Sequence, residues 1–267
     1  MKFSHRLADF RMCLKGKLRA HRLESARAPI FVVGTGRSGT HWLGHILESH
    51  PALKVTVERQ PMFGWSKSMA LNATLEAELM PRLVERYRLA QAASLPLRYA
   101  DKSHPNLWFT SALAQHFPGA RFIGVQRGVH AVVASMLRHS GVLRSIEHWQ
   151  TFPVPNRFLG ITSDNRLAYK NLSVVERCTL RWLAHRDELL RLKQQHPGDF
   201  LLLDYELLMQ DTTQQLIGLQ EFLGEDQPFP ETAVKTTSLN KWRDQLSERQ
   251  IAQIDRCCAD FNGPKLD

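Results

Sequence analysis

The residues best suited to chemistry stand in a glycine-rich loop near the start of the chain, Gly34-Thr35-Gly36-Arg37-Ser38-Gly39-Thr40. Glycines let backbone N–H groups curl around an anion, and a helix starting at Thr40 would add the positive end of its dipole. Arg37 supplies a permanent positive charge, while Ser38 and Thr40 supply hydroxyl donors. The loop therefore predicts a phosphate-binding site.

A second cation ends an apolar run further along the chain. Arg127 follows the segment 121–126, and Ser135 stands eight residues later in a predicted helix. An arginine fork forms charge-assisted bonds to phosphate, and a serine one or two helical turns on can add a neutral donor. The pair predicts a second phosphate contact.

Two side chains could remove a proton from a reacting group. Glu58 ends a predicted strand, and the carboxyl ends of strands carry the sites of open α/β sheets. His104 has the more suitable intrinsic pKa and stands two residues after Lys102, a candidate to stabilise a leaving group. Glu58 is slightly favoured, and the choice stays open. The other histidines, His185 among them, are interpreted as solvent-exposed.

The elements that position these residues alternate between strands and helices. Short apolar or alternating runs predict strands at 30–33, 54–58, 121–126 and 200–205. Helical periodicity or caps predict helices at 40–49, 74–93, 105–117, 129–139, 173–195, 211–223 and 247–260. Residues 140–172 are expected to be irregular. The pattern predicts an α/β fold with three layers (α/β/α) around a central, mostly parallel sheet, resembling the P-loop nucleotide-binding fold.

Composition describes an ordinary globular protein with a basic excess. The 267 residues are 43% hydrophobic and carry a formal charge of +9, which suits an anionic ligand or surface. Four cysteines without C-x-x-C spacing predict free thiols and a cytoplasmic location. We divide the chain into a basic helical leader, 1–28, and one domain, 29–267. Apolar residues of the leader recur at helical spacing, which fits a docked surface helix or peripheral membrane contact: Phe3, Leu7, Phe10, Leu14 and Leu18.

The glycine-rich loop has a specific resemblance. The segment from Phe31 to Leu43, FVVGTGRSGTHWL, resembles the 5′-phosphosulfate loop of the PAPS-dependent sulfotransferase family (PAPS is 3′-phosphoadenosine-5′-phosphosulfate). That family has Lys or Arg where Arg37 stands and then Ser-Gly-Thr-Thr, so His41 replaces the second Thr. The resemblance implies PAPS as donor, PAP as product, no metal, and donor contacts from residues of the loop: Gly36, Arg37, Ser38, Gly39, Thr40 and His41.

Other motifs extend the resemblance. Arg127 and Ser135 resemble the 3′-phosphate motif, although the common Asp-Pro after the arginine is absent. The spacing of Lys102 and His104 is similar to the Lys-Thr-His of cytosolic members, whose His is the base. Glu58 is similar to the base of carbohydrate-type and tyrosyl-protein members.

A weaker resemblance lies near the end of the chain. Trp242 and Arg243 precede the last predicted helix, much as Trp-Arg does in many bacterial members, and would contact the nucleotide. The resemblance implies a small-molecule, glycan or lipid acceptor that contacts the stretch 140–172, with no nucleic-acid partner.

Two other functions stay open. A P-loop kinase or NTPase would need a lysine directly after Gly39, where Thr40 stands instead. A non-enzymatic binder of nucleic acid or anionic lipid would suit the +9 charge, but the basic residues are spread along the chain and are densest in the leader.

Overall fold

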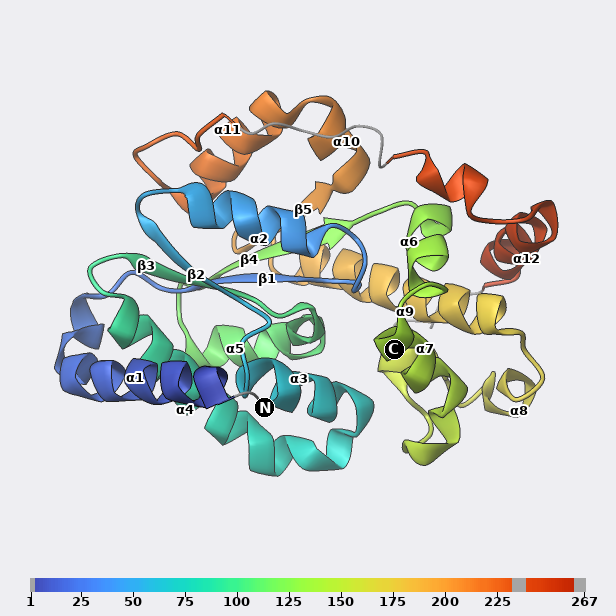
Figure 1. Cartoon of the computed structure of the whole chain (residues 1–267), viewed down its shortest axis with the longest axis horizontal. Coiled ribbons are helices and arrows are strands. Elements are labelled where there is room, and N and C mark those ends of the chain that lie inside the picture. The colour runs from blue at the N-terminus through green and yellow to red at the C-terminus, as the bar shows by residue number, and fades with distance from the viewer. Residues whose placement is uncertain (1–2, 232–238, 262–267) are drawn as a thin grey trace.

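The computed structural model describes residues 3–231 and 239–261, with side chains described from Leu7 onward. A five-stranded parallel sheet in the order β2-β3-β1-β4-β5 forms its centre (Figure 1). The strands are Ile30–Gly34 (β1), Leu53–Val57 (β2), Arg98–Lys102 (β3), Arg121–Gln126 (β4) and Phe200–Asp204 (β5).

Helices cover both faces of the sheet, which confirms the predicted three-layer α/β/α fold. One face carries α3, α4 and α5, with α1 outside α4, and the other carries α2, α10 and α11 (Figure 1). The α-helices are Phe3–Arg19 (α1), Thr40–Ser49 (α2), Met62–Leu71 (α3), Glu76–Ser94 (α4), Thr110–His116 (α5), Val129–Met136 (α6), Ser140–Glu147 (α7), Arg166–Tyr169 (α8), Val174–Gln195 (α9), Tyr205–Gln210 (α10), Thr212–Leu223 (α11) and Glu248–Ala259 (α12).

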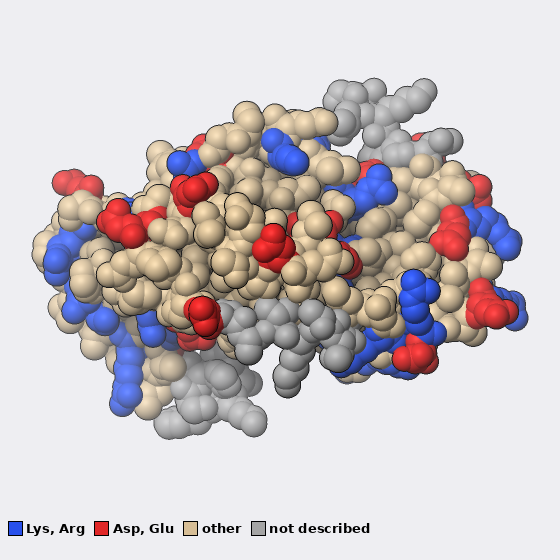
Figure 2. Space-filling model, turned by 90° about the horizontal axis from the view of Figure 1, so that it is seen from above, with Lys and Arg blue, Asp and Glu red and all other residues tan. Residues whose placement is uncertain are grey.

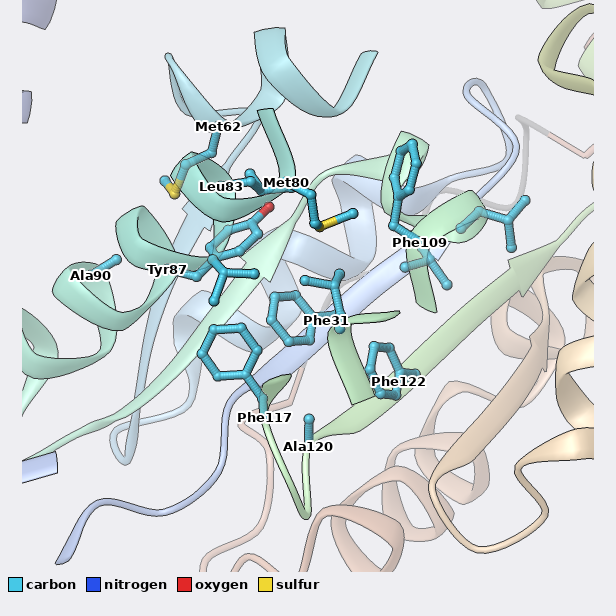
Figure 3. Close-up of a cluster of buried hydrophobic side chains, with 14 of the residues drawn as sticks. Phe31, Met62, Met80, Leu83, Tyr87, Ala90, Phe109, Phe117, Ala120 and Phe122 are labelled. Atoms are coloured by element: carbon cyan, nitrogen blue, oxygen red, sulfur yellow. The ribbon is translucent and has the colours of Figure 1, made fainter. Parts of the chain in front are cut away.

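The central strand β1 is apolar on both faces because both are covered by helices, as a parallel sheet requires. Phe31 is fully buried, and its ring lies 5.1 Å from that of Tyr87, 5.7 Å from Phe117 and 5.4 Å from Phe122. Figure 3 shows these four rings gathered together, with the Tyr87 ring contributed by α4. This cluster fixes the strand that leads into the glycine-rich loop.

The sheet register brings the ends of four strands to one edge. Val57 of β2 and Val32 of β1 both pair with Lys102 of β3, and Gly34 of β1 pairs with Val125 of β4. The residues that directly follow these strands therefore share the carboxyl edge of the sheet. Ligands of open α/β sheets bind outside this edge, where neighbouring connections leave in opposite directions.

Helix α1 packs along α4. Met12 is buried in the core below β1, Asp9 pairs with Arg86 at 2.5 Å, and Gly16 lies against the backbone of Leu89. The other side of α1 exposes a row of large apolar side chains: Leu7, Phe10, Leu14 and Leu18. No helix within residues 3–231 and 239–261 is long and apolar enough to cross a membrane.

Four expectations about local structure need correction or addition. Residues 140–172 contain α7 and α8 and are not wholly irregular, and the first part of the predicted helix 105–117 is a 3-10 turn, His104–Phe109. Helix α3 was not predicted. His185 is fully buried, with its ring against Trp108, because it lies on the core side of α9 and not on its surface.

Charge is distributed in separate groups on the face shown in Figure 2. Lys and Arg side chains there alternate with Asp and Glu side chains and form no continuous basic surface. This arrangement gives little support to a binder of polynucleotides on that face.

Candidate active site

The glycine-rich loop between β1 and α2 has a backbone that only glycine can adopt at two positions. Gly34 has φ of 144°, and an added Cβ would lie 2.8 Å from the carbonyl oxygen of Val125. Gly39 has φ of 90°, and a Cβ there would lie 2.3 Å from the ring of Tyr205. Arg37 itself has φ of 81°, an uncommon conformation for a residue with a side chain. The loop is thus held in a strained, compact turn.

This turn leaves donors available for an anion. The Ser38 side chain is 1% exposed, and its hydroxyl has no hydrogen-bond partner among the described residues. Helix α2 begins at Thr40, so the loop ends at the positive end of a helix dipole. A buried hydroxyl without a partner costs free energy, which an anion bound in the loop would recover. The residues of the loop therefore fit a phosphate.

The structure brings the two predicted phosphate motifs together. The Arg37 Nε donates to Ser135 Oγ at 3.0 Å, although the residues are 98 positions apart. The Arg127 guanidinium lies 4.4 Å from the centre of the Tyr205 ring, and its backbone carbonyl accepts from Trp182 at 2.9 Å. Cations from the β1 and β4 loops thus lie beside each other at the carboxyl edge.

The candidate acid–base residues form one connected cluster. Lys102 Nζ donates to Glu58 Oε1 at 2.5 Å, and His104 Nδ1 lies 3.1 Å from the same oxygen. Lys102 Nζ also lies 2.9 Å from Nδ1 of His41. Glu58 has φ of 45°, so the chain bends sharply to place this carboxylate after β2. The three elements that follow β1, β2 and β3 each contribute one or more members.

The charges of this cluster follow from burial and pairing. Burial alone would raise the pKa of Glu58, but the His104 hydrogen bond and the Lys102 charge outweigh it and lower the pKa to about 2. Burial lowers the pKa of His104 to about 4, against the opposing effect of Glu58. Glu58 is therefore ionised and can only accept at neutral pH, so Nδ1 of a neutral His104 donates to it. The His104 Nε2 is left as an acceptor.

Nε2 of His104 points toward the glycine-rich loop. A Cβ added at Gly36 would lie 3.1 Å from this nitrogen, so the loop passes close by only because residue 36 is glycine. A group bound by the loop would therefore lie beside a proton acceptor.

Asp101, next to Lys102 in β3, holds the strand that carries this cluster in place. Its carboxylate is fully buried and accepts from Thr56 at 2.9 Å and Tyr87 at 3.0 Å. Burial raises its pKa to about 6, although these hydrogen bonds oppose the change. The network fixes the end of β3, and with it the backbone of Lys102.

A cavity of about 160 Å³ opens beside the loop and the cluster. Sequence reasoning named six of its lining residues: Gly36, Arg37, His41, Glu58, Lys102 and His104. Four other lining residues, Gly141, Val142, Ser145 and Phe158, fall in the stretch 140–172 that was expected to contact the acceptor, although none of them was named individually. The sequence analysis gave no site role to the remaining four: Phe63, Lys67, His139 and Arg181. Arg181 left one signal in the sequence, since it falls on the face of its helix that Cys178, Trp182 and Leu189 make apolar.

Trp242 and Arg243 lie elsewhere. The Trp242 ring stacks on His130 of α6 at 4.7 Å, and the Arg243 guanidinium lies 4.6 Å from the centre of the Trp242 ring. Neither residue lines the cavity. Their contact with a nucleotide stays a prediction.

Metal-ligating side chains do not gather in the described part of the chain. No group of three or more His, Cys, Asp or Glu residues there has the spacing of a metal site.

Comparison with known proteins identifies relatives of this chain. The profile described as "Sulfotransferase family" matches residues 29–231. The "Putative protein-tyrosine sulfotransferase" of Caenorhabditis briggsae is 24% identical over 260 residues, covering 85% of this chain and 84% of that protein.

Two solved structures share the fold. The sulfotransferase domain of the Synechococcus PCC 7002 olefin synthase has a TM-score of 0.52 at 17% identity, covering 88% of this chain and 96% of that domain. The sulfotransferase domain from the curacin biosynthetic pathway has a TM-score of 0.54 at 16% identity, with the same coverage of 88% and 96%.

Proposed function

Because the chain belongs to the sulfotransferase family, we propose that it transfers a sulfuryl group from PAPS to a hydroxyl or amine of an acceptor in this cavity. The contact between Arg37 and Ser135 carries the proposal, since it joins a 5′-phosphosulfate loop to a 3′-phosphate motif. PAPS carries a 3′-phosphate, which ATP lacks, in addition to its 5′-phosphosulfate, so two adjoining phosphate sites suit this donor.

Different residues would bind the two phosphate-bearing ends of the donor. The loop residues Gly36 to His41 would hold the 5′-phosphosulfate, with the Ser38 hydroxyl as one donor. Arg127 and Ser135 would hold the 3′-phosphate. Arg37 lies between the two groups because its side chain reaches Ser135 while its backbone belongs to the loop.

The acid–base cluster would carry out the transfer. In the reaction the acceptor oxygen forms a bond to sulfur while the bond from sulfur to the phosphate oxygen breaks, and the acceptor proton must leave. We assign that proton to Nε2 of His104, since Glu58 occupies the Nδ1 side and has the lower pKa. Glu58 would orient His104 and stabilise its positive charge, and Lys102 and Arg37 would stabilise the charge on the leaving phosphate.

The acceptor class is narrowed by the relative and by the cavity. The Caenorhabditis protein is named a putative protein-tyrosine sulfotransferase, which supports a phenolic hydroxyl as one acceptor class. A cavity of about 160 Å³ is close in size to one that holds benzene. One ring of an acceptor would fill it.

Calorimetry tests the donor. We expect PAP to bind without magnesium and more tightly than AMP or ATP, and Arg127→Ala to weaken PAP at least about tenfold. Arg121→Ala is the matched control, because Arg121 begins the strand β4 that Arg127 follows and pairs with Asp199 at the surface. Magnesium-dependent binding of ATP that equals or exceeds that of PAP would refute the proposal and support a kinase.

We also propose that the exposed side of α1 contacts an anionic membrane surface. Phe10 is 64% exposed and Leu18 69% exposed, and basic residues such as Lys15 and Lys17 stand between them. Apolar and basic side chains on one helix favour such surfaces.

A further inference from the structure

The cavity contains a buried cation that the proposed transfer does not use. Arg181 lies on α9 and lines the cavity, so it belongs to a different element from the loops that carry Arg37 and Arg127. The residue is only 2% exposed, although arginine is rarely buried without a partner.

Within residues 3–231 and 239–261, no anion neutralises Arg181. Among the described residues, no carboxylate pairs with its guanidinium, and its buried Nε has no hydrogen-bond partner. Its close contact is with the Phe158 ring, whose centre lies 4.3 Å from the guanidinium carbon. Burial lowers its pKa to about 10, so it remains charged at neutral pH. A buried charge without a counter-ion is costly, and a ligand anion would remove that cost.

A second cation faces the same space. Lys67 of α3 lines the cavity, forms no ion pair within the described residues, and has its pKa lowered by burial and by the charge of Arg181. The lining residues include four Lys or Arg side chains and one carboxylate, Glu58. Glu58 is already paired with Lys102, and the donor would pair with Arg37. Two positive charges are left for another anion.

We propose that the acceptor is a small hydroxylated anion whose carboxylate, phosphate or sulfate group binds Arg181, with Lys67 beside it. That the bound anion is the acceptor rests on the proposed function, whereas the anion site itself rests on the burial and charge of Arg181. The cavity holds about one ring, and Phe63 and Phe158 supply apolar walls. Its charged group would lie on the α9 wall and its hydroxyl on the opposite wall, near His104.

The test compares an acid with a neutral molecule of the same shape. Protein saturated with PAP is titrated with 4-hydroxybenzoate and with 4-hydroxybenzamide, and the melting temperature and affinity are measured. We expect the acid to raise the melting temperature and to bind at least about tenfold more tightly than the amide. Acetate and inorganic phosphate, as smaller anions, should also stabilise the protein.

Two variants test whether Arg181 is responsible for the preference for the acid over the amide. Arg181→Met should abolish the preference for the acid and, without ligand, should melt no lower than the wild type, because an unpaired buried charge is removed. Arg177→Met is the matched control on the same helix, since Arg177 bonds to the backbone carbonyls of Tyr169 and Lys170. It should keep the preference.

Three results would overturn the inference. One is equal binding of acid and amide, with none of the anions stabilising the wild type more than Arg181→Met. Another is a preference that Arg181→Met leaves intact. The third is an Arg181→Met protein whose affinity for PAPS falls at least about tenfold while its affinity for PAP is unchanged, which would assign Arg181 to the sulfuryl group of the donor. A protein that prefers the acid but does not bind PAP would refute the proposed donor and leave the anion site standing.

Discussion

The assignment of His104 as base can be tested by changing the two members of its pair separately. His104→Ala removes the proton acceptor, and general-base catalysis contributes about 10²- to 10⁴-fold. Glu58→Gln keeps an oxygen that can accept from Nδ1 but removes the negative charge 3.1 Å from that nitrogen. The two variants should therefore differ in the size of the loss.

The expected loss for Glu58→Gln follows from electrostatics. At an effective dielectric constant of about 20, unit charges about 4 Å apart attract by about 4 kcal/mol. With about half of the proton transferred in the transition state, about 2 kcal/mol of stabilisation is lost, or about 30-fold in rate. Lys102 would also lose its counter-ion, so thermal melting must show that the variant is folded.

The assay is release of PAP from PAPS with phenol or 4-hydroxybenzoate as acceptor. We expect kcat to fall more in His104→Ala than in Glu58→Gln, and added imidazole to restore part of the activity of His104→Ala alone. PAP affinity should stay within about threefold in both variants, since neither residue is assigned to the nucleotide. A nearly unchanged kcat in His104→Ala, together with a loss above about 10³-fold in Glu58→Gln, would make Glu58 the base.

Two further predictions concern acid stability and membrane contact. Burial lowers the pKa of His104 from 6.5 to about 4, so the folded state binds fewer protons than the unfolded state between these values, and stability falls as pH decreases from 6.5 to 4. In urea unfolding, the free energy of unfolding should fall by about 3 kcal/mol less in His104→Gln than in the wild type over that pH range. Equal losses in the two proteins would contradict this assignment. Phe10→Glu should weaken binding to phosphatidylserine vesicles, measured by co-sedimentation, at least about tenfold. Leu207→Glu, at a residue 53% exposed on α10, should not, and equal effects of the two changes would exclude α1 as the contact.

The fold could be predicted where local signals agree with tertiary structure. The run 30–33, the glycine-rich loop and the helix from Thr40 combine three independent signals, and the structure contains β1, the loop and α2 at those positions. Helix α3 carries apolar and small residues on several sides and includes Gly64, so it has no clear helical stripe. Its place depends on packing against α4, which the sequence does not display.

The site could be predicted in part for a similar reason. Residues at or just after the ends of strands meet at one edge of a parallel sheet, which brings Glu58, Lys102 and His104 together. Glu58 ends a predicted strand, whereas β3, which ends at Lys102, was not among the predicted strands. Arg181 was harder to predict, because a charged residue in a long helix is ordinarily placed on its solvent side, and the apolar face that it shares with Cys178 and Trp182 was one weak signal against that. The burial of Arg181 and His185 depends on the elements that close over α9, and residues 140–172 supply several of them.

Helix α9 serves two parts of the molecule at once. Leu189 and Leu192 anchor its second half in the core under the sheet, while its first half carries Arg181 into the cavity. The proposed donor contacts belong to other elements, the loops after β1 and β4. With the proposed acceptor site, a single codon change at position 181 would alter which acceptor is used while the proposed donor contacts are inherited unchanged, so that gene duplicates would diverge in substrate without rebuilding the catalyst.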